Sequence, residues 1–209
     1  MSQKTENIDE SKQPLIQHLV ELRSRLIKSL ILISVLFVAA YIFADSIYNF
    51  LVQPYADAVS GDESRRLIFT ALHETFFTYL KVALFASIFI ALPFILIQIW
   101  IFVAPGLYKN EKSVVVPYLI ATPILFFIGA ALVYYFIMPL AIKFFLSFES
   151  IGGDGSLPIQ LEAKVNEYLS LVMRLIFAFG LSFQLPVILT LLARMGFASS
   201  EGLRKNRKY

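Results

Sequence analysis

Long apolar runs separate the polar parts of this sequence. Two of the four runs contain no charged residue; the first includes Lys28 near its start, and the fourth includes Glu167 near its start and Arg174 further along. About 20 apolar residues are enough for a helix to cross the hydrocarbon core of a membrane. The pattern therefore predicts four transmembrane helices, at residues 26–44, 82–104, 114–142 and 165–193.

The segment before the first run has two parts. Residues 1–12 are polar and predict a disordered cytoplasmic tail. From there, Leu15, Leu19, Leu22 and Leu26 recur at the spacing of one helix face, which predicts an amphipathic helix leading into the first span. We expect residues 13–209 to form a single transmembrane domain.

Composition agrees with this pattern. The chain has 209 residues, of which 58% are hydrophobic and 16% are charged. Soluble domains are about 45–50% apolar and about 25% charged, so an ordinary soluble domain is excluded. The chain has no cysteine, which excludes disulfides and cysteine-based metal sites. The predicted fold class is an all-α, polytopic membrane helix bundle.

The distribution of basic residues predicts the orientation. Twelve of the 18 Lys and Arg residues lie in the N-terminal arm, in the loop between the second and third spans, or after the fourth span. Only five lie in the other two loops. Since basic residues accumulate on the cytoplasmic side, both termini are expected in the cytoplasm. The basic balance does not indicate nucleic-acid binding, because no basic stripe with stacking aromatics occurs outside the spans.

The spans offer little that could support catalysis. Apart from Glu167 near the start of the fourth span, they contain no His, Asp or Glu, which argues against an intramembrane protease, a proton relay or a carboxylate metal site. No nucleotide-binding loop or HExxH motif occurs. We therefore expect no catalytic residue, no metal site and no cofactor.

Two polar residues lie inside the fourth span. Arg174 either extends to the membrane surface or faces a wet cavity. Gln184 lies near the midplane and either bridges helices or lines a polar cavity. If both residues faced one cavity, the chain would be a small secondary transporter with a solute path, which is the main alternative function. A lipid-interacting structural bundle is a third.

Prolines and acidic residues add two further hypotheses. Pro93, Pro123, Pro139 and Pro186 lie in or at the ends of the apolar runs and predict a kinked, closely packed bundle. Glu21 and Glu111 place negative charge on an otherwise basic face, where they could pair with an arginine-containing peptide. The alternative is that Glu111 is simply solvated and that Glu21 pairs with Arg25 one helical turn away.

Four stretches together resemble the TatC family, the receptor subunit of the twin-arginine protein translocase. They are HLVELRSRL at 18–26, FVAPGLYKNEK at 102–112, the pattern FxxGxxxxYxxxxPLAxxF across 126–144, and FGLSFQLPV at 179–187. The resemblance implies a cupped bundle with six spans, both termini in the cytoplasm and no catalytic activity. Because no transit-like extension precedes the first of these motifs, we expect a bacterial cytoplasmic, or inner, membrane and not a thylakoid membrane.

The family likeness also implies a function and partners. It implies binding of paired-arginine signal peptides and transport of folded proteins, with TatB-like and TatA-like single-span subunits, driven by the proton-motive force. Glu21, Arg23 and Glu111 would then belong to the signal-peptide site. Pro54 and Lys81 also match positions that are typical of the family.

Two departures from the family pattern stand out. Many relatives have Glu where this chain has Gln184, so the resemblance does not extend to a role that needs ionisation there. The family also continues beyond LRKNRKY with two further spans, so we expect the fifth and sixth helices to be missing from this chain.

Overall fold

A computed structural model describes residues 2–60, 65–107, 112–152 and 157–194. These ranges contain two isolated β-bridges but no strand. The helices are α1 (Ser2–Ile42), α2 (Ala44–Ala58), α3 (Glu74–Leu107), α4 (Lys112–Leu132), the π-helical turn η1 (Val133–Ile137), α5 (Met138–Leu146), α6 (Val165–Ser182) and α7 (Leu185–Arg194). The predicted all-α class is confirmed.

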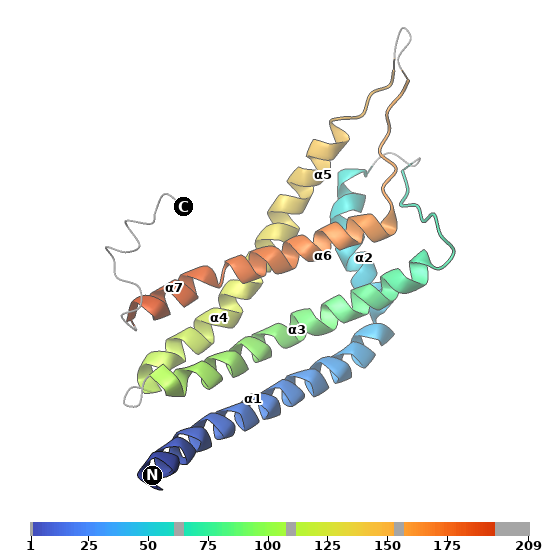
Figure 1. Ribbon diagram of the computed structural model, residues 1–209. Helices are drawn as coiled ribbons and strands as arrows, with labels where there is room; N and C mark the ends of the chain where they lie inside the picture. Colours follow the sequence, from blue (N-terminus) through green and yellow to red (C-terminus); the bar gives the residue numbers. More distant parts are fainter. Residues whose placement is uncertain (1, 61–64, 108–111, 153–156, 195–209) are drawn as a thin grey trace.

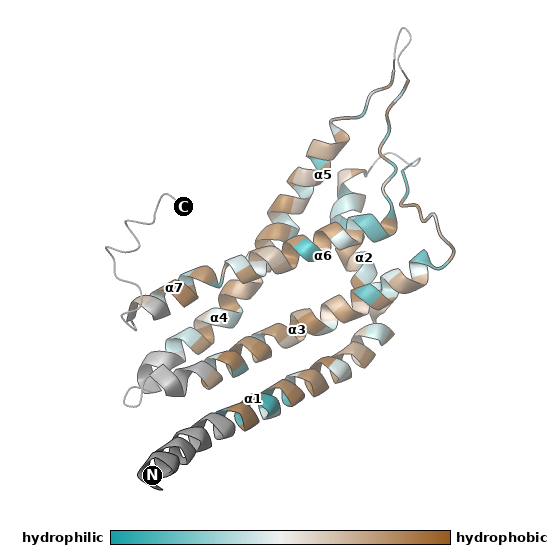
Figure 2. Ribbon diagram, in the orientation of Figure 1, coloured by the Kyte–Doolittle hydropathy of each residue, from teal (hydrophilic) through white to brown (hydrophobic). Residues whose placement is uncertain are grey.

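Four segments of the described chain are long and apolar enough to cross a membrane, as the sequence predicted. They are His18–Ile42, Glu74–Phe102, Pro117–Leu146 and Val165–Thr190. Each overlaps one predicted span, although the first and the second both begin eight residues earlier than predicted. Figure 2 shows apolar residues along the middle of α1 and α3, and hydrophilic residues at the beginnings of α3 and α6.

The amphipathic helix and the first span form one continuous helix, α1, as expected. The structure differs from the prediction at residues 2–12, which continue α1 as helix where a disordered tail was expected. This segment contains no Gly or Pro and is rich in Lys, Glu and Gln. These residues favour helix, so nothing in the local sequence ends the helix at residue 13.

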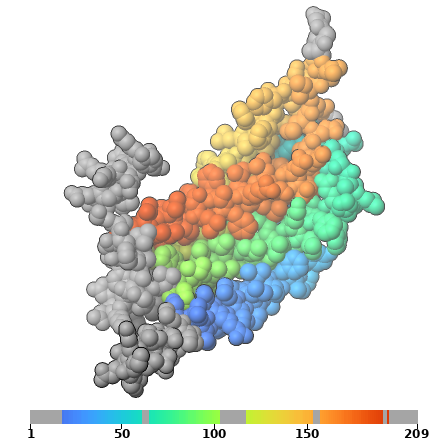
Figure 3. All heavy atoms as spheres, viewed as in Figure 1, coloured from blue at the N-terminus to red at the C-terminus, as the bar shows by residue number. Residues whose placement is uncertain are grey.

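The helices are arranged around α3. α1 packs along α3, and α3 also contacts α2, α4 and α6, while α4 packs against α6. Figure 1 shows the beginning of α1 and the end of α7 at one end of the bundle, with α2 and the beginnings of α3 and α6 at the other. The bands of α1, α3 and α6 lie side by side in Figure 3. We call the end of the bundle with the beginning of α1 the α1 end, and the end with α2 the α2 end.

Two glycines allow α4 and α6 to pack closely. A Cβ atom added to Gly129 of α4 would lie 2.8 Å from the carbonyl oxygen of Phe179 in α6. A Cβ atom on Gly180 would lie 2.5 Å from the ring of Phe126, which is fully buried. Small residues let membrane helices approach closely, so these two glycines determine how near α4 and α6 can lie.

Pro54 explains an unusual contact of α2. Proline has no backbone N–H, so Pro54 cannot donate to the carbonyl group of Phe50 one turn earlier. The hydroxyl of Tyr134 donates to that carbonyl oxygen at 2.7 Å. The hydroxyl of Tyr168 donates to the carbonyl oxygen of the next residue, Leu51, at 3.2 Å. Two tyrosines from the third and fourth spans thus hold α2 across the α2 end.

The other prolines have different effects on their helices. α3 continues unbroken through Pro93. Pro139 lies in the first turn of α5, directly after the π-helical turn. Because a proline ring crowds the carbonyl group four residues before it, the wider π-helical turn makes room at this position. The regular α-helix is therefore interrupted just before Pro139 but not at Pro93.

The two loops at the α2 end are tied together. Arg65 donates from both terminal nitrogens to the two carboxylate oxygens of Glu149, each at 2.6 Å. Glu149 also accepts a hydrogen bond from the backbone N–H of Leu161 at 2.7 Å. The pair lies beside buried Tyr55, and burial raises the pKa of the Tyr55 hydroxyl, an effect that the positive charge of Arg65 partly opposes. We call Arg65 and Glu149 the loop clasp.

Candidate functional site

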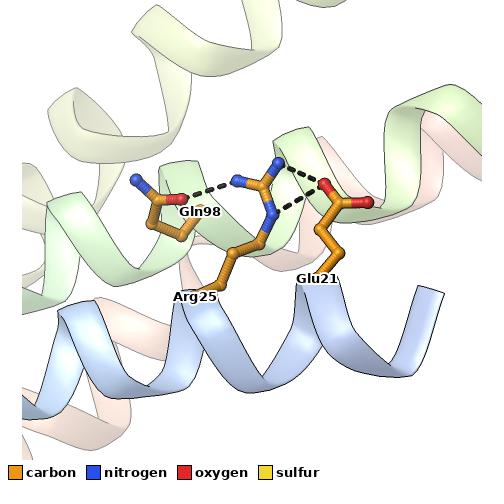
Figure 4. Close-up of polar contacts among 3 residues, drawn as sticks. All are labelled: Glu21, Arg25 and Gln98. Atoms are coloured by element: carbon orange, nitrogen blue, oxygen red, sulfur yellow. Dashed lines mark hydrogen bonds and ion pairs between the residues drawn. The ribbon is translucent and has the colours of Figure 1, made fainter. Parts of the chain in front are cut away.

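Glu21 lies in a polar cluster at the α1 end (Figure 4). Arg25 donates from Nε at 3.0 Å and from Nη2 at 2.6 Å to the same oxygen, Oε1 of Glu21. Its Nη1 donates to Oε1 of Gln98 in α3 at 2.6 Å. The ion pair expected between Glu21 and Arg25 is therefore confirmed, and Gln98 joins it from the neighbouring helix.

This arrangement leaves Glu21 suited to further contacts. Every described hydrogen bond to its carboxylate ends on Oε1, and 42% of the side chain remains exposed. A carboxylate oxygen that faces away from its internal partner can accept from an incoming guanidinium group. Arg25 would hold the carboxylate in place during such an encounter.

The structure describes only one of the two other predicted members of the signal-peptide site. Arg23 is exposed on α1, on a different side of the helix from Arg25. Glu111 lies outside the described residues. Whether Glu21 and Glu111 act on one ligand therefore stays a prediction.

Sequence reasoning missed Gln98 and a ring contact near it. His18 of α1 stacks on Phe102 of α3 with their ring centroids 4.0 Å apart. Gln98 is the only amide side chain in the predicted span 82–104. A polar side chain in such a run usually has a partner on a neighbouring helix, so this exception was a signal that could have been followed.

Arg174 and Gln184 have different surroundings. Arg174 is exposed on α6, whereas the side chain of Gln184 is 4% exposed. Neither residue lines any of the three described cavities. A solute path lined by both residues, as the transporter alternative needs, is therefore without support in the described structure.

Gln184 lies at a break in the fourth span, between α6 and α7. The backbone N–H of Gln184 donates to Leu181, so the carbonyl group of Gly180 loses its usual helical donor. The side-chain Nε2 of Gln184 approaches that oxygen at 3.4 Å and donates to the backbone oxygen of Thr122 in α4 at 3.1 Å. The side chain of Thr122 accepts from Trp100 Nε1 of α3 at 2.9 Å. Gln184 thus bridges helices, one of its two predicted roles.

We predict that Gln184→Leu changes stability little. The variant loses the bond to Thr122, but it also removes a buried amide oxygen that has no partner among the described groups. These effects oppose each other, so we expect a change in unfolding free energy within about 1 kcal/mol. Unfolding in lipid–detergent micelles would measure it. A loss of several kcal/mol would show that the amide oxygen has an important partner.

An apolar groove lies toward the α2 end. Its volume is about 400 Å³, and it gives the bundle a concave face. The lining comes from α2, α3, α4, η1 and α6 and includes Phe50, Phe89, Phe127 and Tyr134. Of the residues on α3 that line the groove, Ile90 is the nearest to Gln98. The two are eight residues apart, or roughly 12 Å along the helix. The groove could hold an apolar peptide segment or lipid chains.

The described part of the chain contains no group of three or more His, Asp and Glu side chains that could hold a metal ion. The features of the site in the described residues are an acidic residue held by an arginine, a buried amide and a separate apolar groove. This arrangement can bind a charged and apolar ligand through hydrogen bonds and burial.

Comparisons with known proteins agree with the fold. The family model described as Sec-independent protein translocase protein (TatC) matches residues 17–209. A Sec-independent protein translocase protein TatC from Magnetococcus marinus is 47% identical over 97% of this chain and 72% of its own length. The TatC protein of Escherichia coli K12 is 40% identical over 96% of this chain and 74% of its own length.

A solved structure is also similar. A crystal structure of the twin arginine translocase receptor TatC in DDM superposes with a TM-score of 0.78 at 35% identity. The match covers 92% of this chain and 82% of that one. The match to the family model, the identities and the shared fold lead to one conclusion: this chain belongs to the TatC family of Sec-independent protein translocase components and is a multi-pass membrane protein.

Proposed function

We propose that this chain is a receptor for paired-arginine signal peptides and a scaffold for transport of folded proteins across the bacterial cytoplasmic membrane. Its N-terminus lies in the cytoplasm in this proposal. TatB-like and TatA-like single-span subunits join it in an oligomeric complex, membrane lipids surround it, and the proton-motive force drives transport. The chain itself catalyses no reaction.

The observation that carries the proposal is the geometry of Glu21. Its carboxylate is oriented by Arg25, and Arg25 is in turn held by Gln98 of α3. An incoming arginine therefore meets an acceptor that has already lost much of its conformational freedom, which lowers the entropic cost of binding. In this proposal Glu111 supplies a second acceptor, and Arg23 a further contact.

The apolar groove is assigned the hydrophobic stretch of the signal peptide. An extended chain advances about 3.3 Å per residue, so four residues cover the roughly 12 Å between the levels of Gln98 and Ile90. A peptide with its arginines at the α1 end can thus reach the groove with a short spacer. The aromatic lining favours burial of an apolar segment.

The test is photo-crosslinking to a signal peptide in native membranes. A photoreactive residue at position 110 or 111 and another at exposed Val20 should crosslink a peptide with paired arginines. The same peptide with paired lysines should crosslink much less, because lysine cannot form the bidentate contact. A third probe at exposed Leu30, in the apolar part of α1, is the control for chance contact.

Charge reversal makes the test specific. We expect Glu111→Lys to lower peptide binding at least tenfold while membrane insertion stays normal, since it replaces an attraction by a repulsion. Glu162→Lys, at an exposed acidic residue in the α5–α6 connection, is the matched control and should bind normally. Normal binding by Glu111→Lys, or equal crosslinking of both peptides, would contradict the receptor assignment.

A further inference from the structure

The α2 end contains a second polar site that the proposed function does not use. It is a cavity of about 410 Å³ between the beginnings of α3 and α6. Its charged and polar lining includes His73, Glu74, Lys81, Lys164, Asn166 and Glu167. We call it the interfacial cradle. Lys81 is the family-typical position for which the resemblance gave no role.

The cradle lies where two membrane spans begin. The spans Glu74–Phe102 and Val165–Thr190 both start at its wall. The loop before α3 is fixed to the beginning of α6, because Ile68 donates to the carbonyl oxygen of Ala163 at 3.0 Å and accepts from the backbone N–H of Val165 at 2.9 Å. The cavity is therefore held at the level where hydrocarbon gives way to lipid head groups.

The cradle has two lysines and two glutamates, and some of these groups have hydrogen-bonding capacity left for a ligand. Lys81 donates to Oδ1 of Asn166 at 2.6 Å and has two further ammonium hydrogens. Lys164 lies 3.9 Å from Glu167, beyond hydrogen-bond distance, and the side chain of Glu167 is 74% exposed. The two ammonium groups can donate hydrogen bonds to a phosphate between them, and the Glu167 carboxylate can bind a cation.

Glu74 is engaged differently from Glu167. Its Oε2 accepts hydrogen bonds from the backbone N–H groups of Thr70 and Ala71, at 2.9 and 3.3 Å. It therefore stabilises the loop that forms one wall of the cradle. Glu167 remains as the exposed carboxylate for a ligand.

Apolar side chains beside the cradle indicate contact with lipid. Leu72 is 97% exposed although it lies outside the spans, and Phe69 and Phe76 are more than half exposed. Exposed apolar side chains on this loop and on the first turn of α3 are unfavourable in water but are stabilised when they enter the membrane interface. Aromatic residues are typical of this level of a membrane.

We propose that the interfacial cradle binds the head group of a phospholipid that carries a primary amine, with the phosphate between Lys81 and Lys164 and the ammonium group at Glu167. The lipid comes from the leaflet on the α2 side. A primary ammonium group has three hydrogen-bond donors for the carboxylate, whereas a quaternary one has none. The site therefore prefers phosphatidylethanolamine to phosphatidylcholine, and it prefers either to an anionic glycerol head group that leaves Glu167 unpaired.

Native mass spectrometry of the membrane-extracted protein tests this. The protein is exposed to equal amounts of phosphatidylethanolamine, phosphatidylcholine and phosphatidylglycerol, and bound lipid is measured. We expect phosphatidylethanolamine to be retained preferentially. Glu167→Gln should remove its advantage over phosphatidylcholine, and Lys81→Gln with Lys164→Gln should lower lipid retention about tenfold. Glu162→Gln and Lys143→Gln, at exposed sites outside the cradle, are matched controls and should retain lipid normally.

Two further outcomes decide the assignment. Equal retention of the three lipids, or unchanged selectivity in Glu167→Gln, would overturn it. Inorganic phosphate that displaced the lipid completely at millimolar concentration would also overturn it, because the site would then recognise phosphate without the amine. Glu167 is exposed, so its variant is expected to fold, and thermal unfolding checks that the lysine variants are folded. The test does not depend on signal-peptide binding.

Discussion

Gly129→Val is expected to destabilise the bundle by about 3 kcal/mol or more, because the new side chain meets backbone atoms that cannot rotate away. Even a Cβ atom at this position would lie 2.8 Å from the Phe179 carbonyl oxygen and 3.1 Å from the Cα atom of Gly180. Relief requires α4 and α6 to separate along their contact. Unfolding by denaturing detergent in mixed micelles would measure the loss.

Two variants test this explanation. Ala131→Val, at an exposed position two residues along the same helix, is the matched control and should leave stability nearly unchanged. Gly180→Ala should be less harmful than Gly129→Val, because its Cβ meets the ring of Phe126 and not backbone. Phe126→Leu in the Gly180→Ala background should restore part of the lost stability. Near-normal stability of Gly129→Val would contradict close contact between these helices.

Breaking the loop clasp is expected to have the second large effect. Glu149→Ala leaves Arg65, whose side chain is 16% exposed, without its bidentate partner and deprives the Leu161 N–H of its acceptor. Removing the bidentate partner of a largely buried charge is costly, and allowing for its partial exposure we expect a loss of about 2 to 3 kcal/mol. Protease sensitivity of the connection at 147–164 should rise with it. Resistance to proteolysis and the unfolding free energy are the two measurements.

The matched control for the clasp is Glu162→Ala, which removes an exposed carboxylate from the same connection. It should be nearly neutral. Arg65→Glu combined with Glu149→Arg should recover part of the stability lost in either single variant, although the Leu161 contact will not be restored. Equal effects of Glu149→Ala and Glu162→Ala would show that the clasp contributes little.

Several features of the fold followed directly from the sequence. Apolar runs of sufficient length in a membrane protein form helices because unpaired backbone groups are too costly in hydrocarbon. This local rule predicted the four spans, and the four-residue spacing of Glu21 and Arg25 predicted their ion pair. The prolines in the apolar runs also indicated a closely packed bundle. The roles of particular prolines were less clear, since α3 continues through Pro93 whereas a π-helical turn precedes Pro139.

The site depended more on packing between distant segments. Gln98 lies 73 residues from Arg25, and Glu149 lies 84 residues from Arg65. No short-range pattern specifies such partners, because they depend on how whole helices and loops are aligned. The same holds for Tyr134, whose hydroxyl compensates for the donor that Pro54 lacks.

The sequence by itself determined the helical class, the number of spans, the resemblance to the TatC family and the residues able to carry charge or bend a helix. Only the tertiary structure decided that Gln184 bridges helices while Arg174 faces outward, and that Lys81 and Glu167 lie beside one cavity. The physical reason is that hydrophobic length and local spacing act within one segment. Burial and hydrogen-bond partners depend instead on how the segments pack together.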